Sequence, residues 1–270
     1  METWERMDHW YLVLPPSRPS PYHLSVLRDE MSKIDRGKPV AVLGSTPEFR
    51  DLLFQLGFRD IFVFEKHASV YSALSELRCH TNSETLVIGN WVETLPTYPG
   101  KFEVILSDLT SGNIPYDLQG KFYSGIARAL NEEGVFIDKI LTFHGPKRNI
   151  KVLSARYSEM PFNLLTLNYF NCEFLFCSEL LDVKDLVDTT MFYEILEGEF
   201  TNDVLRKFLS ECRKITPPDS IWYYGREWDE VSVCYDQSLE KLKEYAEEAG
   251  SPYYGNLKII ISGRKHKTEA

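Results

Sequence analysis

The feature that most constrains the fold is an alternation of short apolar runs and helix-forming segments between residues 38 and 143. The apolar runs are rich in β-branched residues and are expected to be strands, at residues 39–43, 61–64, 85–88, 103–107 and 135–142. Helical spacing of apolar residues predicts helices between them, at residues 47–57, 68–79 and 117–131. Buried strands that alternate with helices are typical of a parallel sheet covered on both faces. The sequence therefore predicts an α/β core with a doubly wound, Rossmann-like sheet.

The alternation stops after Phe143, and this change divides the chain. Helical, aromatic-rich sequence follows the fifth strand and ends at Pro217-Pro218, which predicts a helical insertion. Most of its aromatic side chains are expected to form the insertion's own core, and a few to line a pocket. The expected segments are an N-terminal segment with a leading helix at 1–37, the core at 38–144, the helical insertion at 145–218 and a C-terminal completion of the sheet at 219–270.

Shorter elements are expected on both sides of this core. Apolar spacing predicts the leading helix over residues 22–34, with Ser20 as its cap. Near the C-terminus, Val231–Tyr235 is expected to be a strand and residues 237–249 a helix. The run from Leu257 to Ser262 is expected to be the last strand.

Composition narrows the classes of function. The formal net charge of −10 counts against a nucleic-acid-binding protein, since phosphate recognition needs clustered Lys and Arg. The apolar runs are shorter than the roughly 20 residues of a membrane-spanning helix, and no secretory signal is recognisable at the N-terminus, so a cytoplasmic location is expected. The 5 cysteines include no CxxC pair, which favours reduced, packed thiols over a zinc site, and no metal is expected.

A tight turn after the first strand carries the first candidate binding residues. Gly44 ends the apolar run and Pro47 opens the next helix, so free helix N–H groups lie above the sheet edge. Glu65 ends the second strand at the same edge, where a carboxylate can accept hydrogen bonds from ribose hydroxyls. The alternative for Glu65 is a solvated acid at a strand end.

Polar and aromatic residues follow the next two strands. Asn90 can exchange hydrogen bonds with an adenine edge, and Trp91 can stack on the ring, although packing is the commoner role of a tryptophan. Asp108 ends the fourth strand and begins a polar stretch, so this edge is the expected reacting region. The alternative for Asp108 is a cap of the following turn.

Together these segments resemble the class I S-adenosylmethionine-dependent methyltransferases. The sequence VAVLGSTPEF resembles that family's first motif, LVIGNWVETLP its adenine segment, FEVILSDLTSGNIPY its fourth-strand motif and ALNEEGVFIDKI its fifth-strand leader. The resemblance implies a Rossmann-like methyltransferase sheet and S-adenosyl-L-methionine as the cofactor of the core. The residues that it implies for cofactor binding are Arg18, Gly44, Ser45, Thr46, Glu48, Glu65, Lys66, Asn90, Trp91 and Asp108.

A narrower likeness is to a bacterial methyltransferase subgroup with an LGxTPE first motif, which Arg18-Pro19-Ser20 and Trp91 also fit. The chain departs from the family in specific places. Ser45-Thr46-Pro47 replaces two glycines of the first motif, and Asn90 stands where Asp is usual. These departures make the methionine end of the site the least defined. There, the resemblance leads us to expect Glu48 near the ammonium group and Arg18 near the carboxylate.

Methyl transfer needs alignment of the acceptor with an activated methyl group and exclusion of water. A general base is needed only if the acceptor must lose a proton. Asp108 and His144 are the candidate catalytic residues, with His23 and His67 as alternatives. The expected acceptor is a small organic molecule methylated on O, N or C, held beneath the helical insertion.

Two other functions stay open at this level. A non-catalytic cofactor-binding or scaffold relative would keep the sheet without turnover. A nicotinamide-dependent oxidoreductase would share the strand–turn–helix–acid pattern but is expected to carry G-x-G-x-x-G, which the first turn lacks. No nucleic-acid or membrane partner is expected, and the insertion is a candidate surface for a homodimer.

Overall fold

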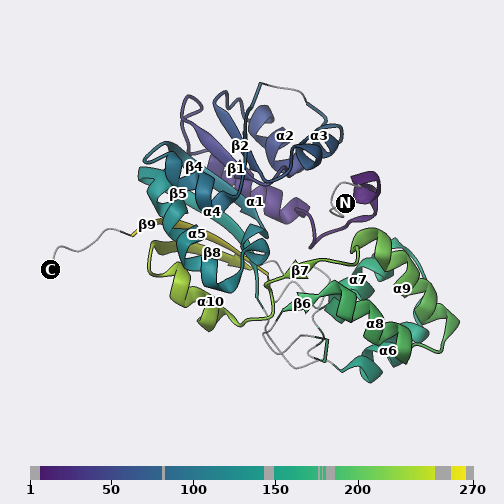
Figure 1. Cartoon of the computed structure of the whole chain (residues 1–270). Coiled ribbons are helices and arrows are strands. Elements are labelled where there is room, and N and C mark those ends of the chain that lie inside the picture. Colours follow the sequence, from purple (N-terminus) through teal and green to yellow (C-terminus); the bar gives the residue numbers. More distant parts are fainter. Residues whose placement is uncertain are drawn as a thin grey trace.

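The computed structural model describes residues 7–80, 83–142, 149–175, 177, 179–180, 186–246 and 257–265. A sheet flanked by helices forms one part of the molecule, and a group of helices lies beside it (Figure 1). The N-terminal segment runs between the two parts before it enters the sheet domain (Figure 1). Among the described helices, none has the length and apolar character that a membrane crossing requires.

The sheet confirms the predicted doubly wound α/β fold. Its parallel strands are β1 (Val40–Leu43), β2 (Ile61–Glu65), β3 (Thr85–Ile88), β4 (Phe102–Asp108) and β5 (Leu130–Leu141). They follow the order β3-β2-β1-β4-β5, so the direction of winding reverses between β1 and β4. A reversal of this kind leaves a crevice at the carboxyl ends of the strands, where ligands of open α/β sheets bind.

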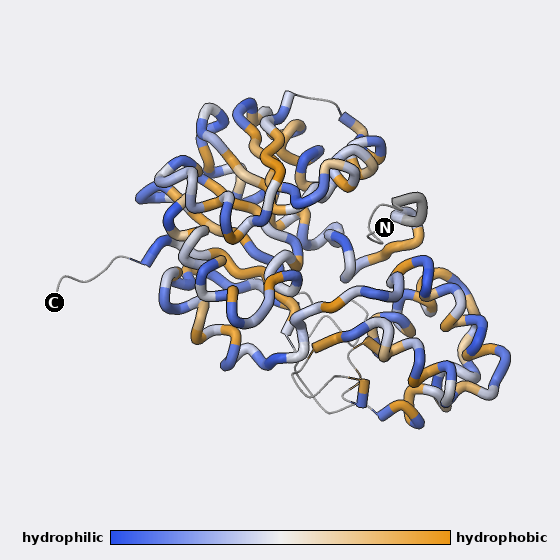
Figure 2. The backbone as a smooth tube through the Cα atoms, viewed as in Figure 1, coloured by the Kyte–Doolittle hydropathy of each residue, from blue (hydrophilic) through white to orange (hydrophobic). Residues whose placement is uncertain are grey.

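Helices cover both faces because the central strands are mostly apolar on both sides. Helices α1 (Pro21–Met31) and α2 (Pro47–Gln55) pack on one face, and α5 (Tyr116–Ala129) packs on the other. The other elements of this part are α3 (Ala68–Ser75), α4 (Trp91–Thr94) and the 3₁₀ helices η2 (Met7–Leu12), η3 (Leu95–Thr97) and η4 (Thr110–Asn113). Hydrophobic segments run through the centre of the sheet (Figure 2). Burial of these segments on both faces is the main source of stability for such a layer.

Two of the predicted C-terminal elements are wrong. Residues 228–235 form helix α10 (Trp228–Tyr235), not a strand, and Leu239–Ala246 forms strand β8, not a helix. β8 pairs antiparallel with β9 (Leu257–Arg264), which itself pairs antiparallel with β5, and the last strand is thereby confirmed. Good helix formers make β8 because β9 offers it a hydrogen-bonding edge along most of its length, and tertiary pairing overrides propensity. Its exposed Lys and Glu side chains suit an edge strand.

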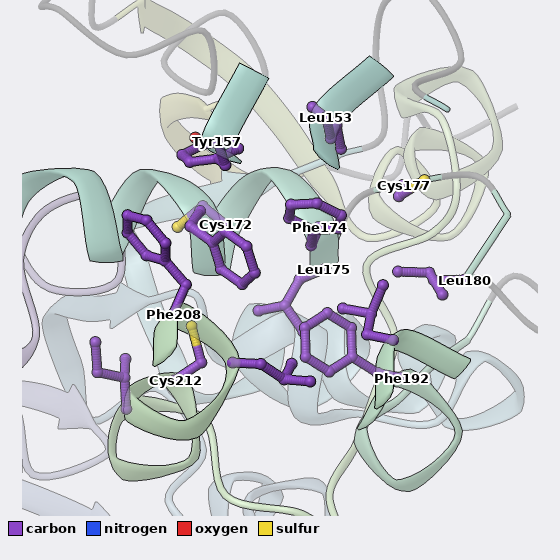
Figure 3. Packing of buried hydrophobic residues seen from close by; sticks show 14 of the residues in the cluster. Leu153, Tyr157, Cys172, Phe174, Leu175, Cys177, Leu180, Phe192, Phe208 and Cys212 are labelled. Carbon is purple, nitrogen blue, oxygen red and sulfur yellow. The ribbon is translucent and has the colours of Figure 1, made fainter. Parts of the chain in front are cut away.

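The insertion is helical, as predicted, and forms its own aromatic core. It contains α6 (Ile150–Ser158), α7 (Leu164–Leu175), α8 (Thr189–Glu199) and α9 (Asp203–Ile215), with a small sheet of β6 (Val187–Asp188) and β7 (Ile221–Trp222). Tyr157, Phe174, Phe192 and Phe208, one from each helix, point into the same interior (Figure 3). The Phe170 ring stacks on Phe208 with 5.0 Å between centroids. The exact limits of the four segments stay a prediction.

The five cysteines differ in their exposure. Cys79 is exposed and Cys234 is partly buried, whereas Cys172, Cys177 and Cys212 are buried in the insertion's core. The prediction that most cysteines are packed is confirmed for these three, and their reduced state stays a prediction.

We predict that Phe170→Ala destabilises the protein by about 3–5 kcal/mol, because it leaves a cavity among stacked rings. Val152→Ala is the control, since Val152 lies on α6 with 68% of its surface exposed. Urea denaturation measures both free energies of unfolding. Equal losses for the two variants would contradict the assignment of Phe170 to a packed core.

Candidate functional site

The first of two cavities opens at the carboxyl ends of β1, β2 and β3 and has a volume of about 750 Å³. Predicted cofactor-binding residues line one wall, namely Gly44, Glu65, Lys66, Asn90 and Trp91. Residues between 113 and 118, before and at the start of α5, also line the cavity, as do residues 219–223, which follow the insertion. We call this the outer cavity, and its volume lies in the range of small-molecule sites.

Glu65 is held in a fixed orientation at the end of β2. Its side chain is buried, with one carboxylate oxygen accepting from the backbone N–H groups of Lys66 at 2.8 Å and His67 at 3.2 Å. The other oxygen accepts from Ser45 Oγ at 2.9 Å. A carboxylate has about four acceptor positions, so one remains for a ligand and a second becomes free if Ser45 turns away.

The turn between β1 and α2 has the geometry that Gly44 was expected to provide. Gly44 has a φ of +79°, which disfavours a side chain, and its N–H donates to Phe64 O at 2.8 Å. The Thr46 side chain makes no capping bond within the described residues, so N–H groups at the start of α2 lack a side-chain acceptor. This helix end can therefore accept a ligand with partial negative charge.

Asn90 and Trp91 lie where β3 ends, and both are partly committed to the protein. The amide oxygen of Asn90 caps α4 by accepting from Val92 N at 3.0 Å. The indole N–H of Trp91 donates to Phe64 O at 2.8 Å, and the ring packs against the core beneath the sheet. Trp91 thus combines the packing role with a ring on the cavity wall.

A second, more enclosed cavity of about 200 Å³ lies beside the first, and we call it the inner cavity. Asn113 and Trp222 line both, so the two cavities adjoin. Its floor includes Ser45, Thr46 and Asp108 at the sheet edge, and α7 contributes Asn171 and Cys172. A few aromatic residues of the insertion, residues 145–218, were expected to line a pocket. None of those that the structure describes lines either cavity, and Phe176 lies outside the described residues.

Asp108 forms a buried ion pair with Lys139, which the sequence reading did not single out. Lys139 Nζ lies 2.6 Å from Asp108 Oδ1 and also donates to the carbonyl oxygens of Pro16 at 2.8 Å and Arg18 at 3.3 Å. Burial raises the pKa of Asp108, and the attraction of Lys139 opposes the rise. The sequence could have pointed to Lys139, because a charged residue stands there inside the largely apolar strand segment FIDKI.

Arg18 and Glu48 form an ion pair with each other. The Arg18 guanidinium also lies over the Trp10 ring, 5.5 Å from its centroid. Neither side chain is among the residues that line the two cavities. Their predicted roles at the two ends of the cofactor's amino-acid part would require this pair to separate.

The four candidate bases have different positions. Asp108 lines the inner cavity and His67 the outer one, whereas His144 lies outside the described residues. His23 is buried with its ring edge against Phe49 and lines neither cavity. Burial and the nearby Lys139 ammonium hold the pKa of His23 well below its usual value, so it is a neutral core histidine.

Strained and close-packed backbone surrounds Asp108. Leu109 has a φ of +59°, an uncommon conformation for a bulky residue. Its carbonyl accepts from the Tyr224 hydroxyl at 2.9 Å, and the Tyr224 ring lies so close to Gly112 that an added Cβ would be 1.6 Å from it. Residues after the insertion thus clamp the end of β4, and no sequence motif had identified Tyr224 or Trp222.

Comparisons with known proteins agree on the fold. No protein-family model matches the sequence, and no curated protein does either. Similar solved structures include the CcbJ methyltransferase from Streptomyces caelestis, with 13% identity, a TM-score of 0.57 and 98% of each chain covered. The N-methyltransferase NodS from Bradyrhizobium japonicum has 8% identity and a TM-score of 0.53, with 97% of this chain and 98% of NodS covered.

NodS was solved in complex with S-adenosyl-L-homocysteine, so this fold accommodates that ligand. A Rhodobacter sphaeroides protein provisionally named as a Zn-dependent alcohol dehydrogenase has 16% identity and a TM-score of 0.62, with 98% of each chain covered. Within the described parts of the present chain, no three His, Cys, Asp or Glu side chains are grouped as metal ligands would be. The chain has the Rossmann-like fold of the methyltransferases among these structures.

We predict that Lys139→Met lowers the free energy of unfolding by about 3–5 kcal/mol, because it leaves the buried Asp108 carboxylate without its partner. The double variant D108N/K139M is expected to recover part of this loss. Urea denaturation of both single variants and the double variant gives the coupling energy. A double variant as unstable as the sum of the two single ones would contradict a direct ion pair.

A pH dependence follows from Asp138, which lies opposite Ser107 in the β4–β5 pairing. Burial raises the pKa of Asp138 well above its usual value, and a hydrogen bond from the Ser107 side chain only partly opposes the rise. The folded state therefore keeps a proton that the unfolded chain releases near its ordinary pKa of about 4. Stability from this group is full below that pH and is lost as pH rises towards the folded pKa.

We predict that Asp138→Asn removes this part of the pH dependence. The stability of the variant relative to the native chain is expected to grow as pH rises above the ordinary aspartate pKa of about 4. Denaturant unfolding at several pH values measures the difference. Parallel stability curves would show that Asp138 has the same pKa in both states.

Proposed function

We propose that this protein transfers a methyl group from S-adenosyl-L-methionine to a small organic acceptor. The observation that carries the proposal is the pair of adjoining cavities at the switch-point edge of the sheet, with the fixed carboxylate of Glu65 in the outer one. The fold likeness to methyltransferases supports the reaction class. The residues after each strand supply the chemistry that a nucleoside ligand needs.

The side chains that line the outer cavity fit an adenosine group. Glu65 has acceptor capacity for a ribose hydroxyl, and Asn90 and Trp91 offer an amide and an aromatic face to the adenine. Lys66 lies on the same wall. Gly44 lines the outer cavity and Ser45 and Thr46 line the inner one, so we assign the amino-acid part of the cofactor to the β1–α2 turn.

The cofactor supplies an already activated methyl group, so the protein has to orient the acceptor and exclude water. The inner cavity suits this task because it is enclosed, mostly apolar and adjacent to the cofactor-binding residues. Asp108 is the candidate general base in its wall, with Lys139 favouring the ionised form against the effect of burial. His144 stays a second candidate from the sequence.

Two alternatives are less well supported. A nicotinamide-dependent oxidoreductase of the doubly wound type usually continues its parallel strand order beyond β5, but here the antiparallel β9 takes that position. A non-catalytic relative would use the outer cavity for binding or would lack a ligand altogether. The LGxTPE subgroup, the cytoplasmic location and a homodimer formed through the insertion stay predictions.

Calorimetry with S-adenosyl-L-homocysteine tests the cofactor. We predict that Glu65→Gln weakens binding by about tenfold or more, because an amide loses acceptor positions and charge. Glu93→Gln is the matched control, since Glu93 is exposed on α4 and lines neither cavity. No binding by the native chain would overturn the cofactor assignment and favour a scaffold. Equal binding by E65Q and E93Q would overturn the role of Glu65 in binding.

A further inference from the structure

Two asparagines on α7 are buried to the same degree but are used differently. Asn168 and Asn171 are each 2% exposed. The Asn168 carboxamide accepts from Leu14 N and donates to Leu12 O, both at 2.9 Å, and so ties the N-terminal segment to the insertion. The Asn171 side chain makes no hydrogen bond with any described residue, and its Oδ1 is buried without a partner.

Asn171 lines the inner cavity. A buried carboxamide without partners is unfavourable for the folded protein and is rare in native structures. Asn168, one helical turn earlier, shows that α7 can satisfy such a group at this depth. The unsatisfied donor and acceptor of Asn171 therefore suit a partner that enters the cavity from outside the chain.

Trp10 adds a second unsatisfied group from the N-terminal segment. It lines the same cavity, and its indole N–H is buried without an acceptor among the described residues. The rest of the wall is largely apolar or aromatic, with Leu175, Trp222 and Tyr224 as examples. Asp108 is the one charged residue among the described residues that line it, and Lys139 neutralises its charge.

We propose that the inner cavity is the acceptor site and that it selects a small, uncharged, mostly apolar molecule with an amide-like group. The Asn171 carboxamide can accept a hydrogen bond from the donor of that group and donate one to its acceptor. The Trp10 N–H donates to a further acceptor. A charged ligand is disfavoured because the wall has no free counter-charge among the described residues. The role of the bound molecule as a methyl acceptor rests on the proposed methyl transfer, whereas the selectivity of the cavity does not.

Three probes of similar shape test the selectivity: benzamide, benzoate and toluene. Benzamide has an uncharged group with a hydrogen-bond donor and an acceptor. Benzoate carries a negative charge, and toluene is uncharged but has no hydrogen-bonding group. Ligand-observed NMR and calorimetry, with and without S-adenosyl-L-homocysteine, measure their affinities. Benzamide is expected to bind at least about tenfold more tightly than the other two, because a site that bonds a polar group rejects analogues that leave it unpaired.

Asn171→Leu removes the polar group with little change in volume and is expected to weaken benzamide binding by about tenfold or more. Leu165→Met is the matched control on the same helix and is expected to keep the native affinity, since Leu165 is 50% exposed and lines neither cavity. Asn171→Leu is also expected to keep or raise the thermal unfolding midpoint, whereas Asn168→Leu lowers it. If N171L does not fold, Trp10→Phe, which removes only the indole donor, is the second test.

The outcomes separate this inference from the proposed function. Equal binding of toluene and benzamide, tighter binding of benzoate, or native benzamide affinity in N171L or W10F would overturn the selectivity. Binding of S-adenosyl-L-homocysteine without any benzamide binding would overturn it as well and leave the cofactor assignment intact. Selective benzamide binding without S-adenosyl-L-homocysteine binding would support the cavity and overturn methyl transfer.

Discussion

The buried ion pair between Asp108 and Lys139 is the interaction on which the site depends. It joins the carboxyl ends of β4 and β5, and the Lys139 ammonium also holds the carbonyls of Pro16 and Arg18. Two charges taken out of water must be paired and hydrogen-bonded to persist. This requirement fixes the N-terminal segment over the sheet edge, and Trp10 and Val13 thereby become part of the inner cavity wall.

The two cavities differ in the way that the protein satisfies their polar groups. In the outer cavity, Glu65 is oriented by two backbone N–H groups and by Ser45 before any ligand arrives. Such preorganisation lowers the entropy that binding must offset. In the inner cavity, Asn171 has no partner, and its position is set by a helix whose other side is packed into an aromatic core. The insertion's rings thus hold α7 in place, and the proposed selectivity comes from Asn171 together with the Trp10 N–H.

The sequence predicted the central sheet well because its strands are apolar on both faces and its helices have clear apolar spacing. It misassigned α10 and β8 because both segments are short and their state depends on distant partners. In α10, Tyr235 reaches a buried position beneath the sheet, and Glu230 accepts the backbone N–H of Glu227 at the helix start. In β8, pairing with β9 prevails over the preference of LEKLKEYA for a helix.

By itself the sequence determined the order of strands and helices between residues 38 and 143 and the turn at Gly44. It also determined the edge of the sheet at which Glu65, Asn90, Trp91 and Asp108 lie. These features depend on local chain chemistry and on the rule that parallel strands end at one edge. Only the tertiary structure decided that Arg18 pairs with Glu48, that Lys139 pairs with Asp108 and that Asn171 is left without a partner. The reason is that a side chain's hydrogen bonds depend on groups far away in the chain, which no local pattern specifies.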